Sequence, residues 1–155
     1  MTLLLGFLLG VSAGLRSMMP VAIVAWAAQL GWPDLRQTSL APMAAPITAW
    51  VFTLFACVEL VFDKLPSTPS RLGAGPLGAR ILMGALCSAT ACAAAHQSIA
   101  VGAVVGAIGG VAGAFAGYHV RRHLTTNLKA PALPVAVAED CLAIAIAAFA
   151  VSRVL

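Results

Sequence analysis

At residues 13–20 the chain reads Ala13-Gly14-Leu15-Arg16-Ser17-Met18-Met19-Pro20, and this stretch breaks an apolar segment that runs from Leu3 to Leu30. One helix over that whole segment would be about 42 Å long, longer than the roughly 30 Å hydrocarbon core of a bilayer. Arg16 would also be costly near the middle of a continuous span in lipid. We therefore predict two pieces, a short span that ends near Gly14 and a half-length or re-entrant element over residues 21–30.

The composition excludes several classes of protein. Hydrophobic residues make up 61% of the 155 residues and charged residues only 9%, whereas an average soluble domain is about a quarter charged. A soluble enzyme, a disordered chain and a nucleic-acid-binding module are thereby excluded, and no basic run carries interleaved aromatic residues. Since each span needs about 20 apolar residues, we predict an all-α integral membrane protein of about five transmembrane helices. Its partner is the lipid bilayer, and residues 1–155 form a single polytopic domain.

Four further apolar segments follow the broken one. They cover residues 43–62, 77–95, 99–120 and 133–155. Only His96-Gln97-Ser98 separates the second of these from the third, which predicts a tight helical hairpin.

The basic residues orient this arrangement. With five spans, the N-terminus lies on the same side as the loops after residues 62 and 120. That side carries most of the positive charge, namely Lys64, Arg71, Arg80, Arg121, Arg122 and Lys129, whereas the other side carries Arg36 and Arg153. Because cytoplasmic loops retain Lys and Arg, we predict a multi-pass protein of the bacterial inner membrane. The N-terminus is then cytoplasmic and the C-terminus lies outside.

Glycines recur every four residues on three helix faces. The faces are formed by Gly6, Gly10 and Gly14, by Gly102, Gly106 and Gly110, and by Gly109, Gly113 and Gly117. This spacing allows helix backbones to approach closely in membranes. We expect helix–helix contacts within or between subunits, including a homodimer packed through these faces. The alternative is a glycine-lined substrate path.

The glycine pattern also indicates an internal repeat. Gly6-x3-Gly10-x2-Ala13-Gly14 recurs as Gly109-x3-Gly113-x2-Ala116-Gly117, and an apolar helix with two acids follows each copy. The repeat halves would be residues 1–75 and 98–155, linked by the helix over 77–95. Because three spans separate the copies, we predict that they point in opposite directions. Such inverted repeats are typical of transporters.

Acidic residues within apolar stretches are the main candidates for a site. Glu59 and Asp63 lie one helical turn apart, and Glu139 and Asp140 are adjacent. Ionisable groups at such depth are usually functional, and these could carry a proton or bind a cation through oxygen ligands. The alternatives are an interfacial position or structural ion pairs with an arginine, for which the candidates are Arg16, Arg80, Arg121 and Arg122.

Arg16 and Ser17 stand at the break, where helix ends leave backbone groups unpaired. An arginine beside a helix N-terminus would favour an anionic group; alternatively, Arg16 is an interfacial anchor or the charge partner of an acid. The predicted substrate- or ion-binding set is Arg16, Ser17, Glu59, Asp63, Lys64, Glu139 and Asp140. We predict no cofactor and no metal site, because His119 and His123 lack a third ligand at a fixed spacing. No motif supports a specific reaction, so an enzyme is not expected.

Three stretches, taken in order, resemble a known family. They are Ala13–Pro20 as quoted above, Val58-Glu59-Leu60-Val61-Phe62-Asp63-Lys64-Leu65-Pro66, and the region from Ala116-Gly117 through Arg121 and Asn127 to Ala138-Glu139-Asp140. Their order is similar to that of small bacterial membrane proteins catalogued as family 4126 of the domains of unknown function. The chain departs from that family at Lys129-Ala130-Pro131, where the family looks to carry a Ser-Pro-Glu-Pro-like turn. The resemblance covers nearly the whole chain and supports the architecture and the choice of site residues, but it implies no activity or substrate.

These observations favour a small transporter or channel-like permease. Glu59 and Glu139 would bind a cation or take up protons at a site near the membrane midplane, and Arg16 would face an anionic group or balance the acids. Two other functions fit the same residues. One is a non-catalytic accessory or assembly subunit of a larger membrane complex, and the other is a lipid-handling membrane protein.

Overall fold

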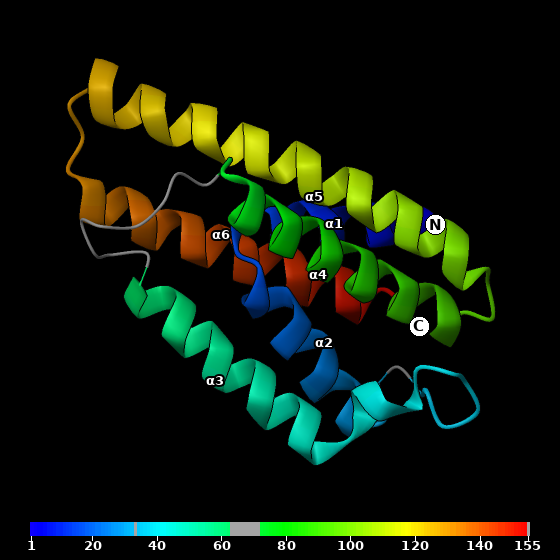
Figure 1. Ribbon diagram of the computed structural model, residues 1–155. Helices are drawn as coiled ribbons and strands as arrows, with labels where there is room; N and C mark the ends of the chain where they lie inside the picture. The colour runs from blue at the N-terminus through cyan, green and yellow to red at the C-terminus, as the bar shows by residue number, and fades with distance from the viewer. Residues whose placement is uncertain (33, 63–71, 155) are drawn as a thin grey trace.

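The computed structural model describes residues 1–32, 34–62 and 72–154, and every regular element in these ranges is helical (Figure 1). The α-helices are α1 (Thr2–Leu15), α2 (Met18–Gln29), α3 (Pro46–Phe62), α4 (Ala74–Ala94), α5 (Ile99–Arg122) and α6 (Ala132–Ser152). A 3-10 turn, η1 (Ala41–Ala44), precedes α3, and a π-helical turn, η2 (His123–Asn127), extends α5. The predicted all-α class is therefore confirmed over the described residues.

The lengths of these helices bear on how many cross a membrane. Within the described ranges, three helical stretches are long and apolar enough to do so: α4, α5 with η2, and α6. The helices α1, α2 and α3 are shorter but also apolar. The count of five spans stays a prediction.

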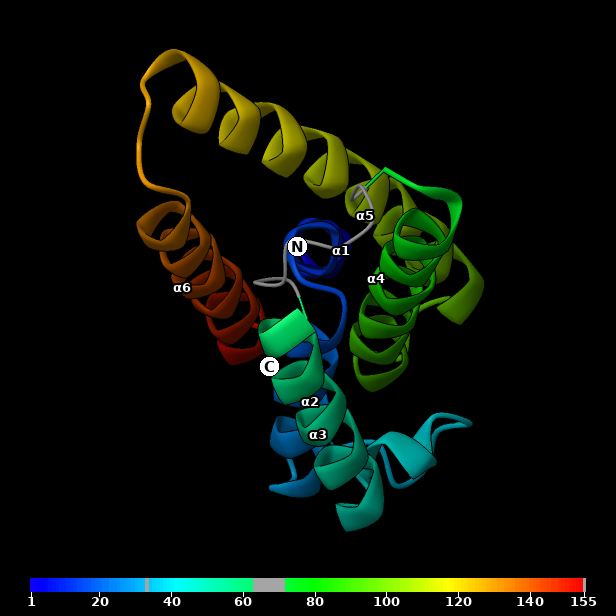
Figure 2. The same ribbon diagram turned by 60° about the vertical axis from the view of Figure 1, so that its left-hand side comes forward.

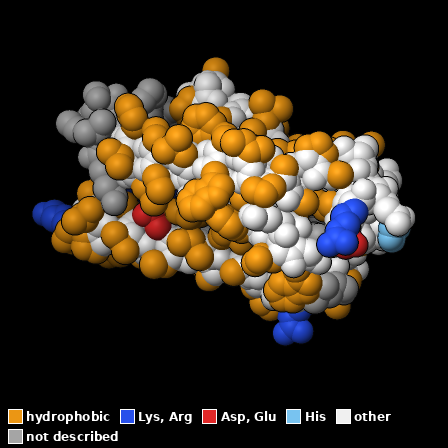
Figure 3. Space-filling model, turned by 90° about the horizontal axis from the view of Figure 1, so that it is seen from below, with side chains coloured by type: hydrophobic (Ala, Val, Ile, Leu, Met, Phe, Trp, Pro, Cys, Tyr) orange, Lys and Arg blue, Asp and Glu red, His pale blue; other side chains and the backbone are white. Residues whose placement is uncertain are grey.

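The outer surface of the molecule is largely apolar. Large hydrophobic side chains stand exposed on the outward faces of several helices, among them Trp50, Leu54, Ile108, Leu142 and Phe149. Hydrophobic side chains cover most of the face drawn in Figure 3, and charged ones are few there. Such a surface would promote aggregation in water and is suited to contact with lipid tails. The chain is thus membrane-like in its surface as well as in its composition.

The predicted break in the first segment is present. The helix α1 ends at Leu15, Arg16 adopts an extended conformation, and α2 begins at Met18. The second piece starts three residues earlier than predicted. The two helices run back along one another as a hairpin (Figure 1), so that Leu9 of α1 and Val24 of α2 line the same small cavity.

This hairpin changes the predicted placement of the N-terminus. Thr2 lines one pocket together with Asp34, His96 and Val154, so both termini lie at the end where α4 turns into α5 (Figure 1). The prediction that the N-terminus shares a side with the loop after α5 is therefore wrong. The physical reason is that α1 has only 14 residues and the chain turns back at Arg16 before reaching the far end.

The predicted glycine faces are packing surfaces within the chain. An added Cβ at Gly10 would lie 2.3 Å from the carbonyl oxygen of Gly106, and one at Gly14 would lie 2.4 Å from that of Gly110. On the other side of α5, a Cβ at Gly106 would lie 2.2 Å from the carbonyl oxygen of Gly84 in α4. The backbones of α1, α4 and α5 thus approach so closely that no side chain fits between them. The faces predicted to join two subunits are occupied inside one chain, and the homodimer stays a prediction.

The same contacts correct the predicted inverted repeat. Gly10 lies against Gly106 and Gly14 against Gly110, so residue numbers rise together along α1 and α5. The two glycine helices run in the same direction (Figure 1), and the prediction that they point in opposite directions is wrong. Counting spans failed because the α1–α2 hairpin returns to its starting end.

Replacing Gly10 with alanine should destabilise the protein by about 1–3 kcal/mol, because the new methyl group must push α1 away from the backbone of α5. Thermal unfolding in detergent would measure the loss. Gly78→Ala is the matched control, since its added Cβ meets nothing within 4 Å and alanine is a better helix former than glycine by about 1 kcal/mol. Equal stability of the two variants would contradict the close packing.

Tags fused to the two termini should report the same side of the membrane, because both termini lie at one end of the helices. Protease protection of each tag in intact and permeabilised cells would measure this. Opposite responses of the two tags would show that α1 crosses the membrane, as the sequence alone suggested.

Candidate functional site

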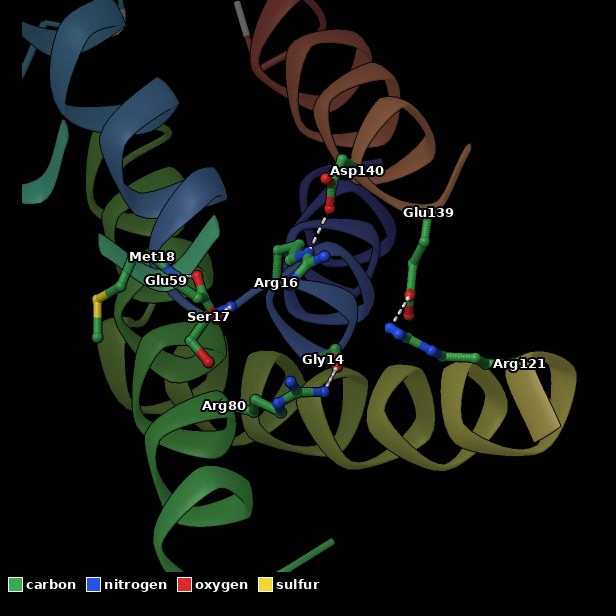
Figure 4. A network of polar contacts seen from close by, with 9 residues as sticks. All are labelled: Gly14, Arg16, Ser17, Met18, Glu59, Arg80, Arg121, Glu139 and Asp140. Atoms are coloured by element: carbon green, nitrogen blue, oxygen red, sulfur yellow. Dashed lines mark hydrogen bonds and ion pairs between the residues drawn. The ribbon is translucent and has the colours of Figure 1, made fainter. Parts of the chain in front are cut away.

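A buried ion pair occupies the break between α1 and α2. Arg16 is fully buried, and its Nε donates a hydrogen bond to Oδ1 of Asp140 on α6 (Figure 4). Two charges taken out of water are tolerated only when they are paired. Of the roles that the sequence left open for Arg16, the structure shows the charge partner of an acid.

Glu59 holds the start of α2. Its two carboxylate oxygens accept hydrogen bonds from the backbone N–H groups of Ser17 and Met18, at 2.8 and 2.9 Å. The first N–H groups of a helix have no partner within the helix, and the helix dipole favours a negative charge beside them. Most helix caps come from the adjoining residue, whereas this one comes from α3. Glu59 therefore ties α3 to the tip of the hairpin.

Arg80 holds the other end of the break. It is buried in α4, and its Nη1 donates a hydrogen bond of 2.7 Å to the carbonyl oxygen of Gly14 in the last turn of α1 (Figure 4). A cation is favoured there because the last carbonyl groups of a helix carry partial negative charge. From the sequence, Arg80 is expected on the cytoplasmic side and as a possible partner of the acids; in the structure it instead holds the end of α1. Its position inside an apolar stretch is the signal that could have added it to the predicted site.

The adjacent acids on α6 serve different partners. Glu139 lies 3.6 Å from Nη1 of Arg121 on α5, measured from its Oε2, while Asp140 pairs with Arg16. Consecutive helix residues point about 100° apart, so one acid faces α5 and the other faces the hairpin. Glu139 thus takes part in one of the structural ion pairs that the sequence left as an alternative.

The structure brings most of the predicted site residues together. Arg16, Ser17, Glu59 and Asp140 meet at the break, with Glu139 beside it (Figure 4), while Asp63 and Lys64 lie outside the described residues. One further contact was not foreseen, since Ser12 Oγ donates a hydrogen bond of 2.7 Å to the carbonyl oxygen of Ala143 on α6. No cluster of three or more His, Cys, Asp or Glu side chains able to hold a metal ion occurs in the described part of the chain.

Replacing Asp140 with leucine should destabilise the protein by about 3–5 kcal/mol, because it leaves the buried charge of Arg16 without this partner. The double variant Arg16→Met with Asp140→Leu should recover a large part of that loss, since apolar residues of similar size replace a buried pair at little cost. Thermal unfolding of the three proteins in detergent would test both statements. A single variant as stable as the native chain would show that the pair contributes nothing.

Comparison with known proteins identifies the family of the chain. A family model described as "Domain of unknown function (DUF4126)" matches residues 3–153, a range that includes both charged helix ends and both acids of α6. No curated protein and no solved structure matches the chain. On this match the chain belongs to the DUF4126 family.

Proposed function

We propose that the protein is a small permease of the bacterial inner membrane, with the break between α1 and α2 as its working site. One observation carries the proposal: both helix ends at a buried break are held by charged side chains from other helices. Arg80 of α4 holds the end of α1, and Glu59 of α3 holds the start of α2. Discontinuous helices of this kind form the substrate and ion sites of many transporters.

The helices divide into two groups that could move relative to one another. The first group is α1, α4 and α5, whose backbones are in direct glycine contact. The second is α2 with α3, joined by a hydrogen bond of 2.8 Å from Trp26 Nε1 to Thr53 Oγ1 and by the edge-to-face contact of Trp26 with Trp50. These contacts join α2 to α3, so the two helices could shift together as one body against the glycine-packed group.

We propose that Glu59 couples the binding of an ion to this movement of α2 and α3. Its carboxylate holds the start of α2 more strongly while it is negatively charged, because a neutral acid is a weaker acceptor for the two N–H donors. A proton or a cation that neutralises Glu59 would loosen this contact and let the α2–α3 pair shift at the hairpin tip. Asp140 and Arg16 would then rearrange as the second charged pair of the same site.

The proposed orientation follows from the basic residues. Arg121, Arg122 and Lys129 lie at or beyond the end of α5, and the positive-inside rule assigns that end to the cytoplasm. Both termini then face the outside, so that only the N-terminus changes side relative to the orientation expected from five full spans. In this arrangement α1 and α2 form a re-entrant hairpin that enters from the outside.

A second candidate function is an accessory or assembly subunit of a larger membrane complex. It is favoured by the ion pairs Arg16–Asp140 and Arg121–Glu139, in which acids are matched by arginines of the same chain. In that case the charges would only hold the helices together. Purification of one partner at fixed stoichiometry would support this function.

Glu59→Gln should lower ion flux by at least about tenfold, because the uncharged amide cannot replace hydrogen bonds to a charged group worth about 1.5–3 kcal/mol. The measurement uses the purified chain in proteoliposomes loaded with a pH-sensitive dye, under a proton gradient and then under Na⁺ and K⁺ gradients.

Arg153→Gln is the matched control, since Arg153 is exposed at the far end of α6 and should leave the flux unchanged. Two results would contradict the permease: no flux above that of protein-free liposomes, or native flux in the Glu59→Gln protein. An effect of the acid variants on thermal stability alone would favour the accessory subunit.

A further inference from the structure

A groove separate from the helix break lies between α1, α5 and α6. The helices α5 and α6 stand apart on either side of α1 (Figure 2), and a groove of about 490 Å³ lies between them in the half of the molecule nearer η2. Its walls are apolar and include Ala116, Val120 and Leu124 on one side and Ala138 and Leu142 on the other, with Leu15 of α1 between them. This volume lies in the range of small-molecule binding sites.

One end of the groove carries positive charge. Arg121 lines it, with a side chain that is 26% exposed and 3.6 Å from Glu139. That separation is an ion pair longer than a hydrogen bond, and a guanidinium group has five N–H donors. Glu139 lines the groove as well and offsets the charge of Arg121. Arg122, which lines a neighbouring hollow with His119 and His123, and Lys129 stand exposed close by in the chain and leave this end with a net positive charge. The groove therefore joins a long apolar surface to a cationic end.

We infer that this groove binds an anionic phospholipid, with an acyl chain along the walls and the phosphate at Arg121. The cations lie where the helices end, which is the depth of the headgroups in a bilayer. Basic pockets between helices on the cytoplasmic side are suited to acidic headgroups. Arg122 and Lys129 supply the preference for a negatively charged lipid over a zwitterionic one.

The charges of the chain argue against a second copy as the occupant. A second copy would have to place an acid opposite Arg121 and Arg122. Of the acids in the described ranges, Glu59, Glu139 and Asp140 contact groups of their own chain, and Asp34 lies at the opposite end, near Thr2. An anionic lipid meets the cationic end without that requirement. The lipid site does not depend on the permease function.

The test is native mass spectrometry of the purified chain in detergent with added phosphatidylglycerol or phosphatidylcholine of identical acyl chains. We expect the protein to retain phosphatidylglycerol at least about fivefold more than phosphatidylcholine. This is the preference that about one Lys or Arg at the depth of the headgroups supplies. The double variant Arg122→Gln with Lys129→Gln should bring the ratio close to one. Arg153→Gln, at the other end of the molecule, is the matched control and should leave the ratio unchanged.

A second pair of variants tests the groove itself. Ala138→Trp and Ala116→Trp each place a large side chain in the groove from an exposed position, so the packed core is left intact, and both should abolish retention of phosphatidylglycerol. Equal retention of the two lipids by the native chain would overturn the inference, as would retention that survives both tryptophan variants. A dimer that Ala138→Trp converts to a monomer would instead identify a second copy as the occupant.

Discussion

The buried charge of Arg16 is the constraint on which the rest of the structure depends. A guanidinium group cannot lie among hydrocarbon side chains without an anion, so α6 must bring Asp140 to it. The same position leaves two helix ends open inside the molecule, and each needs a charge of the correct sign. Arg80 and Glu59 supply those charges from α4 and α3. Three helices, α3, α4 and α6, are thus brought to the hairpin tip by electrostatic requirements that originate at one residue.

Close backbone packing makes this arrangement geometrically feasible. Because α1 lies directly on α5 at Gly10 and Gly14, the short hairpin fits between the long helices and its tip reaches the acids of α6. Direct backbone contact leaves little freedom in the α1, α4 and α5 group. On the other side of the break, charged contacts rather than backbone contacts hold the start of α2 to α3 and the end of α1 to α6.

Several features could be predicted from the sequence because they are local. The break at Gly14–Pro20, the helical hairpin at His96 and the positions of the apolar segments follow from where polar, glycine and proline residues interrupt apolar runs. Among the site residues, Arg16 and Glu59 were identifiable because a charge within an apolar stretch is costly and needs a reason. Arg80 met the same criterion, but it was counted with the basic residues of the cytoplasmic side and named only as a possible ion-pair partner, because it stands close to the start of its segment.

The amino-acid sequence by itself thus determined the membrane class, the helices and the charged residues that require partners. The tertiary structure decided which charge meets which, and the direction in which each helix runs. The pairing of Arg16 with Asp140 joins residues far apart in the chain, and no local pattern distinguishes it from the alternatives with Glu59 or Glu139. The side of the N-terminus depends on whether α1 crosses or turns back. The chain turns back at Arg16, where α3, α4 and α6 supply the partners of the turn, so this choice is a property of several packed helices rather than of any one segment.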